Sequence, residues 1–339
     1  SWLGCELLAA DIPLVADSDP KVTEDAEALI GGALTFEVAA TDRWSPEDNR
    51  DTHPLGDVGQ RLHVTRYVVD GFGQRHPVSL GWFRILESPV EDGLVRVRAG
   101  ELWTVPADYT PIAPIVPVSG SAWDALAEVL ADTLPVPPAL PAGVADVALG
   151  DGVAYDEGRL EAVQALLSVL GLSARVDPAG VIAVYPEPAA VPVLTFRDGV
   201  GGTVVSRVPT VGAPAPNAYV VRTVPEGDDP PIQAVAVIDA GPARWGGPSG
   251  WRVQTWESPL VTSYAECLAT AERLLARAQA RARAWKVTAA PDPRLQADDV
   301  IRIEWTDHAG ASSPLLLRVT QVEHPLTPGS MTITGTEVT

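Results

Sequence analysis

The chain is poor in the residues that cross-link small domains or bind metals. Its 339 residues include only two cysteines, Cys5 and Cys267, and these lie too far apart in sequence to indicate a disulfide framework or a thiolate metal site. A free cysteine is commonly a small buried hydrophobe, and we expect that role for both. A disulfide-stapled scaffold is therefore excluded.

The histidines are also few and scattered among loops and strand ends. None shows the i, i+4 pairing or the short Cys/His spacing typical of zinc sites. Three of them fall within 24 residues, so a metal site formed by convergence in space stays open as an alternative, without a ligand set. The five are His53, His63, His76, His308 and His324. We expect solvated histidines and no bound metal or cofactor.

Long apolar runs are missing as well. No stretch approaches the roughly 20 apolar residues that a membrane helix requires, and no signal-peptide pattern opens the sequence. We therefore expect a soluble protein without a membrane span, made in a cytoplasm. With 46% hydrophobic residues the chain still buries a sizeable core, and its length suggests two or three domains.

Catalytic motifs are absent too. The sequence contains no GxSxG elbow, no P-loop and no HExxH pair. Gly199, Gly201 and Gly202 precede no helical pattern that would present its amino end to a pyrophosphate. The pairs Asp228-Asp229 and Asp298-Asp299 suggest a glycosidase, but adjacent acids point to opposite sides of a strand, and both pairs lie beside turn signals. We expect no enzymatic activity.

Bases are scarce relative to acids. Asp and Glu number 44 against 24 Lys and Arg, giving a formal charge of -20, and residues 1–60 hold half of the excess, with 13 acids against 3 bases. Such a surface repels duplex phosphate, so sequence-specific DNA binding is not expected. Repulsion nevertheless suits the wall of a conduit through which DNA slides without sticking.

The C-terminal part of the chain has the clearest periodicity. Apolar residues recur at three- and four-residue steps over 262–286, which predicts one long amphipathic helix lying on another element. Arg273, Arg277 and Arg281 lie on its polar face and are candidate interface residues. Alternating runs follow the helix and end in MTITGTEV, which predicts an antiparallel meander with the helix against it.

The remaining sequence predicts two further regions. Residues 1–104 alternate apolar with polar positions, as in β-strands, with Phe36 and Val38 on one face and Thr35 on the other. Residues 105–190 begin with a proline-rich linker and continue as a small α/β module with Ser121 as a helix N-cap. Residues 191–339 return to β patterning and contain the long helix. The predicted class is α+β, dominated by β structure.

Three tryptophans cluster in RWGGPSGWRVQTW, at Trp245, Trp251 and Trp256. Exposed indole rings stack on sugars or anchor a partner chain, which makes these residues candidate contacts. Burial against the β core is the alternative, and the high average burial of tryptophan favours it.

Two stretches carry a more specific pattern. In 157–188 a helix leads into two strands around Asp177 and Gly180 and then to Pro186. In 272–338 a helix leads into a strand, Pro-Asp-Pro, a leucine, an acidic turn and the next strand, with Ala297 and Asp298 where a Gly-Asp turn is common. Together these stretches resemble the tail hub proteins of tailed bacteriophages, a baseplate-hub or tail-tip family that includes minor tail proteins of actinobacterial siphophages.

The resemblance implies a homotrimer in the virion, at the tail tip, assembled in the host cytoplasm. Each protomer would supply two tail-tube-like antiparallel β-barrel domains flanking the α/β insert, with the long helix packed on the C-terminal barrel. Three chains would then form a pseudo-six-fold ring between distal tail or tail-tube proteins and tip or fibre proteins. DNA would pass through its channel without specific binding, and we hypothesise that acids of residues 1–60 contribute to the lumen.

Two other functions stay open. A tail-associated cell-wall hydrolase would show muralytic activity that is lost when a single carboxylate is changed. A carbohydrate-binding module for host attachment would show glycan binding that is lost in Trp251→Ala.

Overall fold

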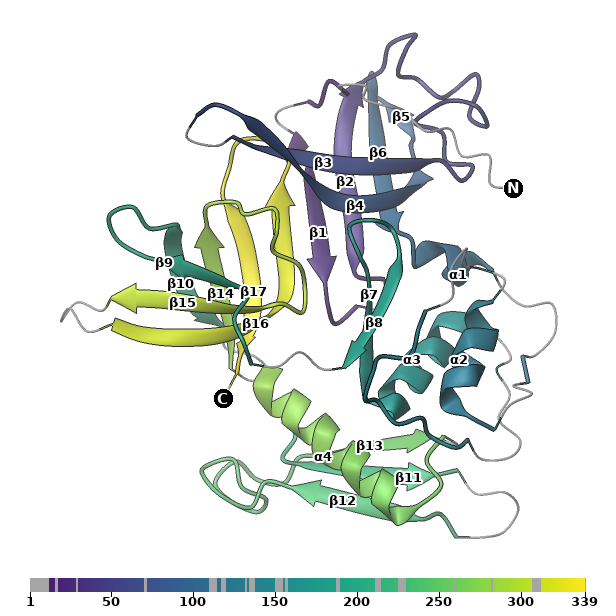
Figure 1. Ribbon diagram of the computed structural model, residues 1–339, viewed down its shortest axis with the longest axis vertical. Coiled ribbons are helices and arrows are strands. Elements are labelled where there is room, and N and C mark those ends of the chain that lie inside the picture. The colour runs from purple at the N-terminus through teal and green to yellow at the C-terminus, as the bar shows by residue number, and fades with distance from the viewer. Residues whose placement is uncertain are drawn as a thin grey trace.

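A computed structural model gives the fold of the chain (Figure 1). It describes residues 12–15, 18–28, 30–69, 72–109, 115–116, 120–131, 133, 138–149, 155, 158–186, 190–210, 215–224, 230–258, 260–281, 283–306 and 312–338. Cys5, Asp228, Asp229 and His308 lie outside these residues. Within them the chain is dominated by β structure, as predicted, and four hydrophobic cores divide it into four units.

The first β unit contains the strands up to residue 101. Its elements are β1 (Lys21–Asp25), β2 (Gly32–Ala39), β3 (Arg61–Val69), β4 (Arg75–Glu87), β5 (Val90–Glu91) and β6 (Leu94–Glu101). In β2, Phe36 and Val38 are buried and Thr35 is exposed, which confirms the predicted faces of this strand. The alternation follows from the pleat, because successive side chains point to opposite sides of a sheet.

The α/β insert follows. Its elements are α1 (Thr104–Asp108), α2 (Ala122–Leu130), α3 (Arg159–Leu170), β7 (Leu172–Val176) and β8 (Ile182–Pro186). Ser121 Oγ accepts a hydrogen bond from Asp124 N at 3.2 Å and caps α2, as predicted. Helix α3 ends at Gly171, whose φ of 70° is the left-handed conformation that glycine adopts readily.

The insert differs from the expected linker at its start. Residues 105–108 belong to α1 instead of to an irregular segment, and Val105 is buried. Pro106 is compatible with this helix because the first turn leaves its backbone amides without intrahelical partners.

The second β unit contains the remaining strands of the large sheet. Its elements are β9 (Leu194–Arg197), β10 (Val204–Thr210), β14 (Ala284–Ala289), β15 (Val300–Thr306), β16 (Ser312–Pro325) and β17 (Met331–Glu337). Strands β15, β16 and β17 pair antiparallel in sequence order, which confirms the predicted meander. Their inward side chains form one core, which includes Ile301, Leu317 and Ile333.

The helix–sheet unit corrects the expected position of the long helix. Strands β11 (Ala218–Thr223), β12 (Gln233–Val237) and β13 (Val253–Ser258) form a separate three-stranded sheet, and α4 (Tyr264–Arg281) lies on it rather than on the meander (Figure 1). The apolar stripe of α4 was predicted, but it meets Tyr219 and Val221 of β11. Cys267 is buried in this interface, as predicted.

Helix α4 is also shorter than predicted. Ser263 Oγ accepts a hydrogen bond from Glu266 N at 3.3 Å, and the Glu266 carboxylate accepts one from Ser263 N at 3.2 Å, so this reciprocal pair fixes the start. At the other end Trp285 belongs to β14. Within the described ranges, no helix is long and apolar enough to span a membrane.

One strand pair joins the two β units. Strand β1 pairs antiparallel with β16, from Lys21 opposite Pro325 to Asp25 opposite Gln321. The sheet therefore runs through both units in the order β10-β14-β17-β16-β1-β2-β6-β4-β3, and β5, β9 and β15 lie off this path. The two cores lie on the same face of the joined sheet. Val22 of β1 belongs to the first core and Val322 of β16 to the second, and the pairing of β1 with β16 puts both side chains on one face.

Candidate functional site

The joined sheet has a face turned away from both cores, here called the open face. It is traced by register, because residues directly opposite each other in paired strands share a face. Two rows define it: Arg98, Thr35 and Lys21, and then Thr23, Glu323, Thr332 and Thr288. The adjacent residues in each strand point to the opposite face and are buried, as Leu34 and Ile333 are. The open face is thus a polar, threonine-rich surface that crosses both β units.

Three bases on the open face are paired with acids. Arg96 Nε lies 3.2 Å from Glu37 Oε1, and the same guanidinium contacts Glu91. Arg98 Nε lies 2.7 Å from a carboxylate oxygen of Glu87. Lys21 Nζ is similarly shared between two acids, Asp19 at 3.4 Å and Glu323 at 3.7 Å. Each of these three bases is therefore neutralised in place, whereas Lys286, which lies on the same face opposite Thr334, is exposed.

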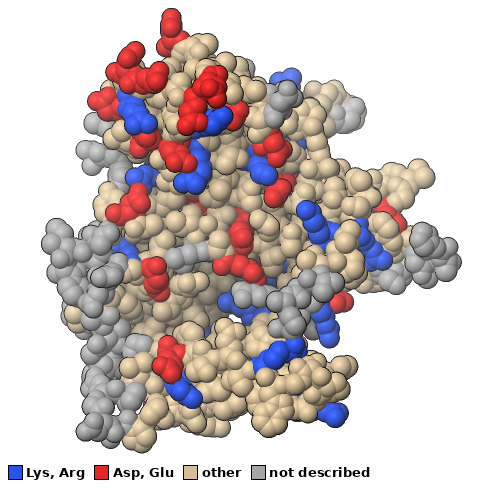
Figure 2. Space-filling view, turned by 180° about the vertical axis from the view of Figure 1, so that it is seen from behind, with Lys and Arg blue, Asp and Glu red and all other residues tan. Residues whose placement is uncertain are grey.

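The described acids of residues 1–60 are distributed over this face, the cavity at the end of β1 and one end of the molecule. Glu37 lies on the open face, whereas Asp42 to Asp57 lie in the loop between β2 and β3. Figure 2 shows acidic side chains gathered at the end formed by the first β unit, with basic side chains beside them. The opposite end, formed by the helix–sheet unit, shows few acids in this view.

The two edges of the joined sheet carry exposed apolar side chains. Among the described residues, β3 pairs only with β4, and β10 pairs only with β14. Tyr67 and Val69 on β3 are each 59% exposed, and Val205 and Val208 on β10 are 68% and 56% exposed. An edge strand with apolar side chains is a template for pairing with another chain.

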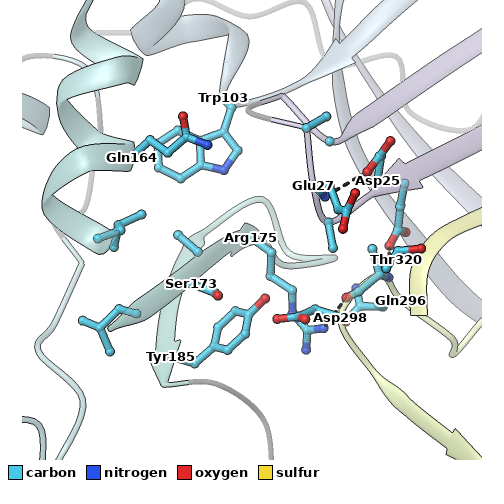
Figure 3. Close-up of a pocket in the computed structure, with 18 of the residues that line it drawn as sticks. Asp25, Glu27, Trp103, Gln164, Ser173, Arg175, Tyr185, Gln296, Asp298 and Thr320 are labelled. Atoms are coloured by element: carbon cyan, nitrogen blue, oxygen red, sulfur yellow. Dashed lines mark hydrogen bonds between the residues drawn. The ribbon is translucent and has the colours of Figure 1, made fainter. Parts of the chain in front are cut away.

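A cavity of about 1160 Å³ lies where the units meet. Its walls come from α3 and β7 of the insert, from α4, from the end of β1, and from the turn 295–299 that precedes β15. Figure 3 shows Asp25 and Glu27 on one side of this space and Arg175, Tyr185 and Asp298 on another, with Trp103 and Gln164 beyond them.

Buried carboxyl groups dominate the electrostatics of the cavity. Burial raises the pKa of Glu24 to about 7, and the negative charge of Glu101 adds to the shift, although the amide of Ala297 opposes it. Burial also raises the pKa of Glu101, whose Oε1 accepts a hydrogen bond from Gly31 N at 2.5 Å. Part of the Glu24 side chain is exposed to the cavity.

The turn 295–299 adds two more acids and their partners. Burial raises the pKa of Asp298, although Arg318 Nε at 3.9 Å acts in the opposite direction. Arg175 Nη1 lies 3.2 Å from Asp299 Oδ1, and its guanidinium carbon lies 5.2 Å from the centre of the Tyr185 ring. Burial, and next the charge of Asp298, raises the pKa of Tyr185. The cavity is therefore a charged junction between units.

Comparison with known proteins connects this architecture to one class of structure. No family model and no curated protein matches the chain. A tail protein from Neisseria meningitidis MC58 superposes with a TM-score of 0.66 at 14% identity, over 95% of this chain and 92% of that protein. The 43 kDa tail protein of prophage MuSo2 from Shewanella oneidensis gives a TM-score of 0.57 at 12% identity, over 95% and 94%. The chain has the fold of phage tail proteins.

This tail-protein fold extends over nearly the whole chain. Prophage tail protein gp18 from Listeria monocytogenes EGD-e also shares it, with a TM-score of 0.52 at 12% identity, over 94% of this chain and 88% of that protein. The superposed regions include the insert and the helix–sheet unit, since each match covers at least 94% of the chain. The predicted resemblance to phage tail proteins is therefore confirmed at the level of the fold.

The tail-protein fold brings together two of the three candidate tryptophans. The rings of Trp245 and Trp251 lie 5.3 Å apart between centroids, and Trp251 is 73% exposed. Trp256 lies apart from them, because its position in β13 turns it toward the core under α4. The loop that carries the pair is held by buried Asn217, which donates to Gly250 O at 2.8 Å and accepts from Arg252 N at 2.9 Å.

Two of the candidate arginines of α4, Arg273 and Arg277, face the insert and the cavity. The Arg273 guanidinium donates a hydrogen bond to Ser168 O at the end of α3, and Arg277 lines the cavity. Arg281 is the last residue of α4, and its side chain lies outside the described residues. Arg273 thus contacts a unit of its own chain, and a role for these arginines toward another chain stays a prediction.

The described histidines have different surroundings. His53 is buried and bonded within its loop, to Arg43 O and Leu55 N, each at 3.0 Å. The ring of His63 stacks on Trp82 with centroids 4.6 Å apart. His324 is fully buried, and burial lowers its pKa to about 4. Among the described residues, no group of three or more His, Cys, Asp or Glu side chains is placed to hold a metal ion.

Sequence reasoning missed the buried carboxyl groups at the junction. Glu24 shares the inward face of β1 with Val22, because residues two apart in a strand point the same way. An acid at an inward position of KVTED was the available signal. Its neighbours Glu101 and Asp299 come from distant parts of the chain and gave none.

Proposed function

We propose that the chain is a structural component of a phage tail tip, a trimeric hub ring that closes or extends the tail tube. The joint between β1 and β16 supports this proposal, because it shows that two β units of this kind pair edge to edge. Among the described strands, β3 and β10 are left open at the two ends of the sheet. Head-to-tail pairing of these edges closes a ring, since a heterologous contact closes when its rotation fits.

The ring accounts for a change of symmetry. Three copies supply six β units in equivalent positions, which adapts a six-fold tube to a three-fold tip. The proposed domains are 1–104, 105–190 and 191–339. The neighbours would be distal tail or tail-tube proteins on one side and tip or fibre proteins on the other, in the virion, after assembly in the host cytoplasm.

The open face is the proposed lining of the DNA channel. Binding of DNA draws its salt-dependent affinity from free Lys and Arg that replace counterions on phosphates. On the open face, Lys21, Arg96 and Arg98 are each already paired with acids. Small polar side chains such as Thr35 and Thr332 fill the rows between them. DNA would therefore pass without specific binding, and Glu37 would be one of the lumen acids.

The role is structural rather than enzymatic in this proposal, but one observation favours a second function. Trp251 is 73% exposed on a loop fixed by hydrogen bonds, and Trp245 lies beside it. A rigid exposed indole pair suits carbohydrate stacking or a partner contact. A host-attachment module is therefore the alternative. A cell-wall hydrolase would require muralytic activity that one carboxylate substitution removes.

Electron microscopy of the purified protein or its parent tail, with a mass measurement in solution, tests the proposal. A three-fold ring with a central channel supports it. The edges are tested by combining Val69→Cys with Val205→Cys. Oxidation should link the two cysteines between copies and give covalent trimers, and reduction should return them to monomers on a denaturing gel. The matched control pairs Val69→Cys with Val235→Cys, an exposed valine of the three-stranded sheet, and should stay monomeric on a denaturing gel.

A further inference from the structure

The turn 295–299 connects three of the four units through one residue, Ala297. From β1, Glu24 Oε2 accepts a hydrogen bond from Ala297 N at 2.9 Å. From β7 of the insert, Arg175 Nη1 donates to Ala297 O at 3.1 Å. The amide and the carbonyl that Ala297 contributes are thus held by different units. The second β unit, to which the turn belongs, is fixed to the other two at this point.

The conformation of the turn depends on these surroundings. Asp298 has a φ of 71°, in the left-handed region that side chains other than glycine adopt at a cost of about 1 kcal/mol. Its amide donates to Val319 O at 2.7 Å, and Asp299 Oδ2 accepts from Gln296 N at 3.0 Å. A non-glycine residue in this conformation persists when its neighbours determine it. The contacts at Ala297 are therefore among those that hold the turn in this conformation.

The charges around the turn are out of balance. Glu24 faces Glu101 from β6, Asp299 from the turn and Arg175 from β7. Asp298 faces Tyr185 from β8 together with the bases Arg318, Arg175 and Arg277, and Arg318 and Arg175 are already in contact with acids. No group suited to a metal ion is found in the described part of the chain. Burial and the neighbouring carboxylates favour the protonated form of Glu24, while the Ala297 amide and Arg175 act in the opposite direction.

We infer that the contact between Glu24 and the turn 295–299 is a proton-sensitive latch, which holds the insert and the two β units together while Glu24 is protonated and loosens when Glu24 ionises. On ionisation the proton leaves through the cavity, which Glu24 lines. The carboxylate then faces Glu101 and Asp299 across low-dielectric surroundings, and Arg175 is shared with Asp299. The pKa of Glu24, raised by burial to about 7, sets the latch near neutral pH.

Hydrogen exchange of the single chain tests the latch without any need for ring formation. Protection factors, corrected for the intrinsic pH dependence of exchange, are measured at pH 5.5 and 8.0 for the turn 295–299 and the β7–β8 hairpin. We expect protection to fall by about tenfold at pH 8.0, the ratio that one pKa unit of preference supplies. In Glu24→Gln the protection should be the same at both pH values.

Two further variants make the result decisive. Glu272→Gln changes an exposed acid of α4 that lines the same cavity, and it should behave as the unmodified chain. If Glu24→Gln fails to fold, Glu101→Gln replaces it, because loss of the Glu101 charge should move the transition to lower pH. Protection that does not change between pH 5.5 and 8.0 in the unmodified chain overturns the latch. So does a pH dependence that persists in Glu24→Gln.

Discussion

The open face and the junction treat charge in opposite ways. On the open face, Lys21, Arg96 and Arg98 contact acids in water, where such pairs form at little cost and contribute little, about 0–1 kcal/mol each. At the junction, Glu24 and Glu101 lie in buried positions where acids exceed bases. Because burial penalises the ionised form, an acid at the junction has a raised pKa, whereas an acid on the open face stays ionised and pairs with a base.

The difference teaches where charge is structural and where it is responsive. A neutralised, solvated face changes little with pH, so it suits a passive channel wall. A buried acid that keeps its proton near neutral pH makes the packing of the units depend on the pH of the solution. Substitutions on either side of β1 test this contrast most strongly.

The largest effect is expected from a charge on the inward side of β1. Val22 is fully buried and opposite His324, so Val22→Asp leaves an unpaired carboxylate in the core and should cost about 3–5 kcal/mol of unfolding free energy. Thr23→Asp is the matched control, because the next residue faces the open side, and it should cost only about 1 kcal/mol, since the new carboxylate lies in water opposite Glu323. Denaturant unfolding measures both, and equal losses would contradict the assignment of the faces.

The next effect concerns the hydrogen bonds at Ala297. Arg175→Gln removes the guanidinium that Ala297 O and Asp299 share, and we expect a loss of about 1–3 kcal/mol at pH 7. Arg294→Gln breaks the exposed pair with Asp292 and should cost under about 1 kcal/mol. Denaturant midpoints with unchanged slopes would report both values. A larger loss in Arg294→Gln would mean that surface pairs, not the junction, hold the units.

A third prediction follows from the sign of the Glu24 shift. Its pKa is about 7 in the folded chain and about 4.5 in the unfolded one, the ordinary value of a glutamate, so the folded state holds a proton that the unfolded state releases between these values. The stability from this proton is fully present below pH 4.5 and is lost as pH rises through 7. Melting curves of Glu24→Gln should therefore gain on the unmodified chain as pH rises from 4.5 to 8, with no gain in Glu272→Gln.

How far the sequence predicted the fold depended on the range of the signal. Ser121 capped its helix as expected, because an N-cap acts on a backbone group a few residues away. The apolar stripe of α4 was visible, but the sheet beneath it was not, since a stripe does not name its partner. Trp256 was grouped with Trp251 because they are close in sequence. In the structure the alternation of β13 turns Trp256 toward the core, while Trp251 is exposed in the preceding loop.

The junction lay beyond sequence reasoning for the same reason. Glu24 and Ala297 are 273 residues apart and are brought together by the pairing of β1 with β16. The acid pair Asp298-Asp299 was correctly assigned to a turn, but its contact with Arg175 requires the insert to be placed. The phage-tail resemblance, carried by short motifs, predicted the fold better than it predicted this contact.

The smallest effect on stability is expected at the exposed indole pair. Trp251→Ala removes a ring that is 73% exposed, so unfolding free energy should change by less than about 1 kcal/mol. Binding to host cell-wall glycan or to isolated tails should fall if the pair is a contact. Trp256→Ala, in the core under α4, should instead destabilise the helix–sheet unit. Unchanged binding of Trp251→Ala to both would remove the pair from the candidate sites.

The symmetry of the particle tests the central claim most directly. Electron microscopy of the assembled protein, or of its parent tail, should show a three-fold ring whose central channel is lined by the open face of the joined sheet, with β3 of one copy beside β10 of the next. A monomer located away from the tail axis, or a ring whose lumen is formed by other elements, would contradict it.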